Sequence, residues 1–190
     1  MGRFFFCTVF GVTSMKVYEI DWRHSSIEAI FDAVSVALAN ISRSFAPEDV
    51  DEASDQAESF LGIAFVAAQA YIYGSLQDAR KLAKSTGKPK RKPEDLLKKF
   101  SSVVSGTRIT EIQVCDEIAN YFKHEWPYWS ERSKRHGKAL GALNAVGITE
   151  STAYPCQEAA KKLWGYSSTD LKPLLLMIAS WREQIIADSK

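Results

Sequence analysis

The sequence has 190 residues, a length that suits one compact domain, residues 1–190, with a sizeable hydrophobic core. Its 24 Lys and Arg nearly balance 23 Asp and Glu. The net charge of +1 therefore provides no overall field for nucleic acid or membranes, and such binding would need a local patch. Three cysteines, Cys7, Cys115 and Cys156, lie far apart and form no CxxC pair, which argues against a zinc site and is typical of reduced cytoplasmic thiols.

Residues 1–22 are a predicted N-terminal extension of the domain. Residues 4–10, FFFCTVF, and 16–22, KVYEIDW, are rich in aromatic and β-branched side chains, so they predict a short β-hairpin. The aromatic run differs from a secretory signal because it has few Leu or Ala and no A-x-A cleavage site follows. No apolar run reaches the ~18–20 residues of a membrane span. We therefore expect a cytoplasmic protein with no membrane partner.

The rest of the chain has the spacing of amphipathic helices, which predicts an all-α fold. Ser25 and Glu28 have the spacing of a capping box and predict the start of a helix that ends before Pro47. The apolar residues on its predicted buried face are Ile27, Ile30, Phe31, Val34, Leu38 and Ile41.

Residues 47–87 give the longest helical pattern. Its first turns are acidic and its last turns are basic, which suits the helix dipole, and Gly87 is a natural residue to end it. The middle, residues 60–73, is apolar nearly all round and predicts the central buried helix. Because ~1.5 Å per residue would give a rod of roughly 55–60 Å, we expect a bend or break near Gly62 or Gly74.

Residues 88–93, KPKRKP, combine four basic side chains with two prolines. They are an exposed linker or a phosphate-binding patch, and the prolines favour the linker because they prevent a regular surface. Further helices are predicted over residues 93–104, from 107 or 110 to 125, 137–147, 155–165 and 168–190. Short connections between the helices predict an antiparallel multi-helix bundle. Its predicted core includes Phe60, Ile63, Phe65, Phe122, Leu175 and Ile178.

The helix predicted up to residue 125 places a polar row beside an apolar stripe. The stripe consists of Ile112, Cys115, Ala119, Phe122 and Trp126. Asp116, Asn120 and His124 follow one another at i, i+4 and i+8, so they line up along one edge of this stripe, with Lys123 close by. The spacing therefore brings a carboxylate, an amide, an imidazole and an ammonium group together at the edge of the core.

This row has two interpretations. An imidazole titrates near neutrality, so His124 is able to transfer protons while Lys123 holds a phosphate. Alternatively, Asn120 and His124 hydrogen-bond to neighbouring helices, because buried polar groups need partners. Glu58, which precedes the apolar stretch of the long helix, is a further candidate to face the row.

The sequence ANYFKHEW, residues 119–126, resembles the motif of HEPN-domain proteins. These are all-helical domains with an Arg-x(4–6)-His signature, in which Asn often follows the arginine to give R-N-x-x-x-H. Asn120 and His124 match the Asn and His of that motif. The resemblance implies an RNA-binding domain or a metal-independent ribonuclease, commonly a homodimer, with a toxin or defence role. Together with VAAQAYI, residues 66–72, the stretch also resembles segments of uncharacterised bacterial proteins.

Ala119 stands where the HEPN motif has its arginine. The arginine would stabilise a phosphate, and alanine cannot. The resemblance therefore implies that Lys123, Arg132 or Arg135 replaces the arginine, or that the domain is catalytically silent. A third interpretation is that the chain is unrelated to HEPN domains.

A basic loop, residues 131–138, follows three aromatic residues. The loop holds Arg132, Lys134, Arg135 and His136, and the aromatic residues are Trp126, Tyr128 and Trp129. Basic groups beside aromatic rings suit single-stranded RNA, through charge and base stacking. The alternative is a solvated loop next to tryptophans that cover the end of the bundle.

No spacing of histidines, cysteines or glycines predicts a metal or cofactor site, so we expect neither. The sequence favours a helical module, a degenerate HEPN-like domain, that binds a protein or RNA partner. The alternative is a metal-independent ribonuclease in which His124 is the acid/base and Asn120 and Lys123 complete the site. The third possibility is a structural or interaction protein of another family.

Overall fold

The computed structural model describes residues 17–89, 91–124, 140–165 and 169–190 of the chain. The fold class is all-α, as predicted: the described residues contain helices and short turns but no strand of a sheet. The elements are η1 (Val17–Glu19), α1 (His24–Ser44), η2 (Pro47–Asp49), α2 (Val50–Ser85), α3 (Pro93–Lys98), α4 (Glu111–Lys123), α6 (Pro155–Trp164) and α7 (Lys172–Ser189). Residues 140–145 are also helical.

The N-terminal hairpin receives no support. Val17–Glu19, within its second predicted strand, is a 3-10 helix, and residues 1–16 lie outside the described residues. The carbonyl oxygens of Tyr18 and Ile20 accept hydrogen bonds from Arg182 of α7, at 3.5 and 3.0 Å. These carbonyls are therefore bound by a side chain rather than by a neighbouring strand.

The start of α1 differs from the prediction. The helix begins at His24, and no side chain caps it, so the predicted capping box of Ser25 and Glu28 is wrong. Just before the helix, the Asp21 carboxylate accepts a hydrogen bond from the backbone N–H of Arg23 at 3.2 Å. The predicted buried face is present except at Ile30, which is exposed.

Helix α2 runs unbroken for 36 residues, through both of the glycines that predicted a bend. Its last residue is Ser85, and Gly87 follows in the predicted position just beyond the helix, with a φ of +74°. The backbone N–H of Lys88 donates to the Ala83 carbonyl at 2.9 Å and closes the last turn. Within the helix, a Cβ at residue 62 would overlap the Phe122 ring, and one at residue 74 would overlap the Arg23 guanidinium. Both glycines therefore permit close packing rather than a kink.

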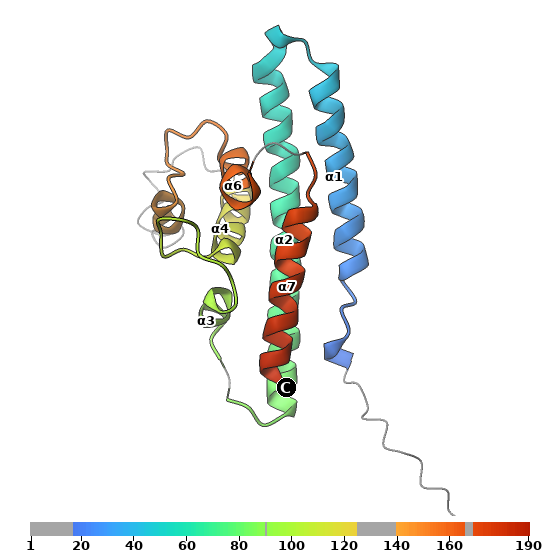
Figure 1. Cartoon of the computed structure of the whole chain (residues 1–190), viewed down its shortest axis with the longest axis vertical. Coiled ribbons are helices and arrows are strands. Elements are labelled where there is room, and N and C mark those ends of the chain that lie inside the picture. Colours follow the sequence, from blue (N-terminus) through green and yellow to red (C-terminus); the bar gives the residue numbers. More distant parts are fainter. Residues whose placement is uncertain (1–16, 90, 125–139, 166–168) are drawn as a thin grey trace, which may run out of the picture.

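Helix α2 is the centre of the fold, and α1, α4, α6 and α7 all contact it (Figure 1). α1 and α4 run antiparallel to α2, since Arg23 meets Asp78, and Asp116 meets Gln69. α7 runs parallel to α2, because the Thr86 hydroxyl donates to the Ser189 carbonyl at the same end of both helices. The antiparallel prediction therefore does not extend to α7.

The core lies along α2, and its predicted members are buried unevenly. Phe65, Leu175 and Ile178 are buried. Phe60 and Phe122 are only half-buried, and Ile63 is 49% exposed. Placing all six residues in the core was therefore wrong for Ile63, because none of the described helices covers that side of α2.

Helix α3 is shorter than predicted. It stops at Lys98 instead of continuing to about residue 104, and Phe100 follows with a φ of 59°. The Trp181 indole N–H of α7 donates to the carbonyls of Leu96 (3.3 Å) and Lys99 (3.0 Å). Trp181 therefore satisfies carbonyl groups that are left without partners at the C-terminal end of α3. Between α3 and α4, Val103 and Thr110 form an isolated antiparallel β-bridge.

By length and composition, α1 and α2 are each long and apolar enough to cross a membrane. Buried core helices of soluble proteins share this property. Most of the apolar stretch of α2 is buried against other helices, whereas most of that of α1 is not. The absence of a membrane partner stays a prediction.

Candidate functional site

Helix α4 carries the predicted polar row, and its first turn is firmly capped. The Thr110 hydroxyl accepts a hydrogen bond from the Gln113 N–H at 3.3 Å, and the Gln113 side chain accepts one from the Thr110 N–H at 3.1 Å. This reciprocal pair fixes the start at the second of the two predicted positions. His124 is the residue that ends the helix.

A single buried amide of α2, that of Gln69, holds the first two members of the row. Its NH2 group donates to a carboxylate oxygen of Asp116 at 2.6 Å and to the Asp116 carbonyl at 3.0 Å. It also donates to the side-chain oxygen of Asn120 at 2.9 Å. Asp116 and Asn120 are therefore neighbours, as predicted, and both are used to join α4 to α2.

Asp116 has a second partner in the Tyr73 hydroxyl, which lies 3.4 Å from its other carboxylate oxygen. Burial raises the pKa of Asp116, although the hydrogen bonds from Gln69 and Tyr73 and the charge of Lys123 act in the opposite direction. Burial, together with the Asp116 charge, raises the pKa of Tyr73 to about 12. Tyr73 is therefore protonated at neutral pH, whereas the titration of Asp116 moves from its usual acidic range toward neutral pH.

The other end of the row is open to solvent. Lys123 and His124 are exposed, and Asn120 is half-buried between them and Asp116. The row is therefore buried against α2 at Asp116 and exposed to solvent at Lys123 and His124. The stripe beside it is buried at Ile112, Cys115 and Ala119 and half-buried at Phe122. Its last predicted member, Trp126, lies outside the described residues.

A shallow groove lies beside this exposed end. Ser59, Ile63, Val66, Phe122 and Lys123 line it. The three α2 residues recur at helical spacing, and Tyr73, 42% exposed, continues the same side of the helix. The surface next to His124 thus combines exposed apolar groups with a positive charge.

Glu58 does not face the row. Its two carboxylate oxygens accept hydrogen bonds from the backbone N–H groups of Cys156 (2.7 Å) and Gln157 (3.0 Å), at the start of α6. A carboxylate suits this position because it satisfies free N–H groups at the positive end of a helix dipole. Burial raises the pKa of Glu58, and these two hydrogen bonds offset part of the effect.

The predicted RNA-binding residues cannot be placed against the row. Arg132, Lys134, Arg135 and His136 lie outside the described residues. Of the cysteines, Cys115 and Cys156 are buried, and burial raises the pKa of both thiols, so neither is a ready nucleophile. Within the described ranges, no three His, Cys, Asp or Glu side chains gather where a metal ion could bind.

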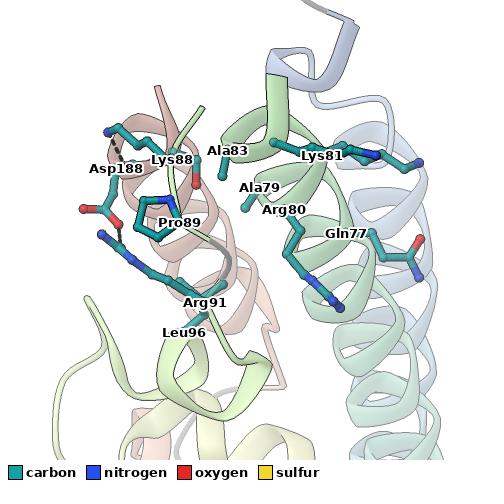
Figure 2. Close-up of a pocket in the computed structure, with 12 residues that line it drawn as sticks. Gln77, Ala79, Arg80, Lys81, Ala83, Lys88, Pro89, Arg91, Leu96 and Asp188 are labelled. Atoms are coloured by element: carbon teal, nitrogen blue, oxygen red, sulfur yellow. Dashed lines mark hydrogen bonds and ion pairs between the residues drawn. The ribbon is translucent and has the colours of Figure 1, made fainter. Parts of the chain in front are cut away.

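A cavity of about 470 Å³ lies at the C-terminal end of α2. Figure 2 shows Ala79, Arg80 and Ala83 of α2 on one side, with Pro89 and Arg91 across from them. Sequence reasoning favoured a plain linker over residues 88–93 and so missed this cavity. The available signal was the basic i, i+4 spacing of Arg80 and Lys84, which runs on to Lys88.

Asp188 of α7 organises one wall of this cavity. Its carboxylate forms ion pairs with Arg91 and, at 2.8 Å, with Lys99. Its carbonyl accepts a hydrogen bond from the Lys88 ammonium group at 2.9 Å (Figure 2). Partial burial and the positive charges of Arg91 and Lys88 lower the pKa of Lys99. Lys88 and Arg91 thus form part of the cavity wall, although Lys88, Pro89 and Lys92 of this segment are exposed.

A second cluster of charges, partly buried, lies among η1, α1, α2 and α7, and no sequence motif marks it. Arg23 contacts Asp78 at 2.6 Å, and Arg182 lies 3.9 Å from the same carboxylate and 3.5 Å from Asp21. The Tyr71 hydroxyl donates to Asp21. The only hint in the sequence is that Asp78 and Arg182 interrupt apolar helix faces. These contacts indicate a structural role.

Searches of protein-family models, curated proteins and solved structures find no match to this chain.

Proposed function

We propose that the chain is a non-enzymatic helical module that binds a protein partner through the α2–α4 face. This face consists of Ile63, Val66, Tyr73, Phe122 and Lys123, beside the exposed His124. The observation that carries the proposal is the apolar stripe on α2, the most central helix of the fold, which no helix among the described residues covers. Exposed apolar groups rimmed by polar ones are typical of protein–protein interfaces.

The hydrogen bonds of the polar row support a binding role over catalysis. Gln69 uses Asp116 and Asn120 to attach α4 to α2, so Asn120 already serves the structure. Ala119 is fully buried, and no arginine occupies the position at which the HEPN motif has one. A degenerate HEPN-like domain, with the frame of the motif but without its phosphate-binding group, fits these contacts.

A second copy of the chain is the first partner to test, because the resemblance to HEPN domains implies pairing. Sedimentation equilibrium of the purified chain should show a dimer, and Ile63→Glu should shift it to monomer by placing a charge in the interface. Val36→Glu is the matched control, since Val36 is 61% exposed on α1, away from this face. Dimers that survive Ile63→Glu, or binding of RNA abolished by it, would contradict a protein interface here.

The alternative function is a metal-independent ribonuclease, and one observation favours it. Lys123 and His124 are exposed beside Asn120, so the reactive end of the row is accessible. Cleavage of single-stranded RNA by the wild type in excess chelator, lost in His124→Ala, would establish this alternative. Under the binding proposal, neither protein cleaves RNA.

A further inference from the structure

The cavity at the shared end of α2 and α7 carries an excess of positive charge. Its basic lining residues are Arg80, Lys81, Lys84, Lys88 and Arg91. Asp188 is the one carboxylate among the lining residues, and it is shared by Arg91 and Lys99. The C-terminal ends of two helices add roughly −0.5 charge each, so about three positive charges remain unbalanced.

Two of these cations are available to a ligand. Within the described part of the chain, neither Arg80 nor Lys84 forms an ion pair, whereas Lys81 lies over the Tyr18 ring, 5.4 Å from its centroid. Arg80 is half-buried, so its charge is less screened than that of a fully exposed side chain. Arginine presents a planar set of donors that matches the oxygens of a phosphate group.

The remainder of the cavity is apolar. Ala79, Ala83, Pro89 and Leu96 contribute to its walls (Figure 2). Leu96 and Ala79 are buried. A ligand that fills this space therefore needs a non-polar part beside its anionic group.

We propose that this cavity binds a small organic phosphate, a molecule with one or more phosphate groups attached to a ring. Arg80 and Lys84 hold the phosphate, and the ring lies against the apolar wall. A volume of about 470 Å³ accommodates a nucleotide-sized molecule, whereas a nucleic-acid chain needs a groove that continues along the surface. Asp188 acts as an internal counter-ion that competes with the phosphate for Arg91. The proposal is independent of the α2–α4 face.

Isothermal titration calorimetry with adenosine 5′-monophosphate, adenosine, inorganic phosphate and a short single-stranded RNA tests the proposal. The wild type should bind the nucleotide at least about tenfold more tightly than adenosine or inorganic phosphate, because only the nucleotide uses both walls. Arg80→Ala should weaken this binding about tenfold or more, the effect of losing one charge-assisted hydrogen bond. Arg43→Ala is the matched control, since Arg43 is exposed at the far end of α1.

Two further variants keep the test decisive if Arg80→Ala alters the fold. Lys84 is exposed, so Lys84→Ala leaves the core intact and should still weaken nucleotide binding. Asp188→Asn removes the competing carboxylate and should tighten binding about threefold or more at low salt. No nucleotide binding, equal affinity for adenosine, equal affinity for inorganic phosphate, or binding of RNA alone would each overturn the proposal. So would equal effects of Arg80→Ala and Arg43→Ala.

Discussion

At the scale of single residues, the contacts of Gln69 separate what is structural in the α4 row from what is available for binding. One amide donates to Asp116 twice and to Asn120 once, and its own side chain is buried. His124, at the end of the same row, is exposed. Residues that share a spacing in the sequence therefore have different roles.

Gln69→Leu should lower the free energy of unfolding by about 2–3 kcal/mol, because it leaves the buried Asp116 carboxylate without its shortest hydrogen bond. His124→Ala should cost less than about 0.5 kcal/mol, as expected of an exposed side chain. Urea unfolding of both variants checks this contrast. Equal losses would show that His124 also holds the helix in place.

Asp116 should make stability depend on pH. Its pKa is raised on folding, so between the unfolded value of about 4 and the raised value the folded state binds more protons. The free energy of unfolding of the wild type should therefore fall, relative to that of Asp116→Asn, as the pH rises through this window. Urea unfolding of both proteins at pH 4.5 and 7 measures the difference. A difference that does not change with pH would contradict the raised pKa.

At the scale of the helices, close packing of α4 on α2 depends on Gly62. The Phe122 ring occupies the space of a Cβ at this position. Gly62 therefore serves close helix packing within an unbroken 36-residue helix and does not bend it.

Gly62→Ala should destabilise the protein, although alanine is favoured over glycine in a helix by about 1 kcal/mol. Gly141→Ala is the matched control, because residue 141 is helical and nothing lies within 4 Å of the position of its Cβ. We expect that control to raise the melting temperature and Gly62→Ala to lower it. A rise in both would show that Phe122 moves aside without cost.

The sequence predicted the helices well where an apolar face and a terminal residue agreed, as at Gly87 and at Thr110. It failed where a distant side chain decides the outcome. Trp181 ends α3 through carbonyls that no local pattern marks, and Arg182 binds carbonyls in the predicted hairpin strand. The adjacency of Asp116 and Asn120 follows from helical spacing alone. Their shared partner Gln69, 47 residues away from Asp116, does not.

At the scale of the whole molecule, the partly buried charge cluster ties the start of α1 to α2 and α7. Arg182 contributes the most connections, since it reaches Asp21, Asp78 and the Ile20 carbonyl. It is almost completely buried, so its loss would leave both carboxylates short of positive charge.

Arg182→Met should therefore lower the free energy of unfolding by about 3–5 kcal/mol, the usual cost of removing one partner from a buried ion pair. Arg43→Met, on the exposed surface of α1, should change it by less than about 0.5 kcal/mol. Thermal and urea unfolding of the two variants provide the comparison. A loss below about 1 kcal/mol for Arg182→Met would mean that Arg23 alone neutralises the cluster.

The parallel packing of α7 on α2 has a consequence for the newly made chain. Roughly 100 residues separate the end of α2 at Ser85 from the end of α7 at Ser189. At about 5–20 residues per second, the ribosome needs roughly 5–20 s to supply them. During this interval the side of α2 that α7 covers has no partner of its own chain. The nascent chain thus exposes an apolar helix surface to solvent before it can close its core.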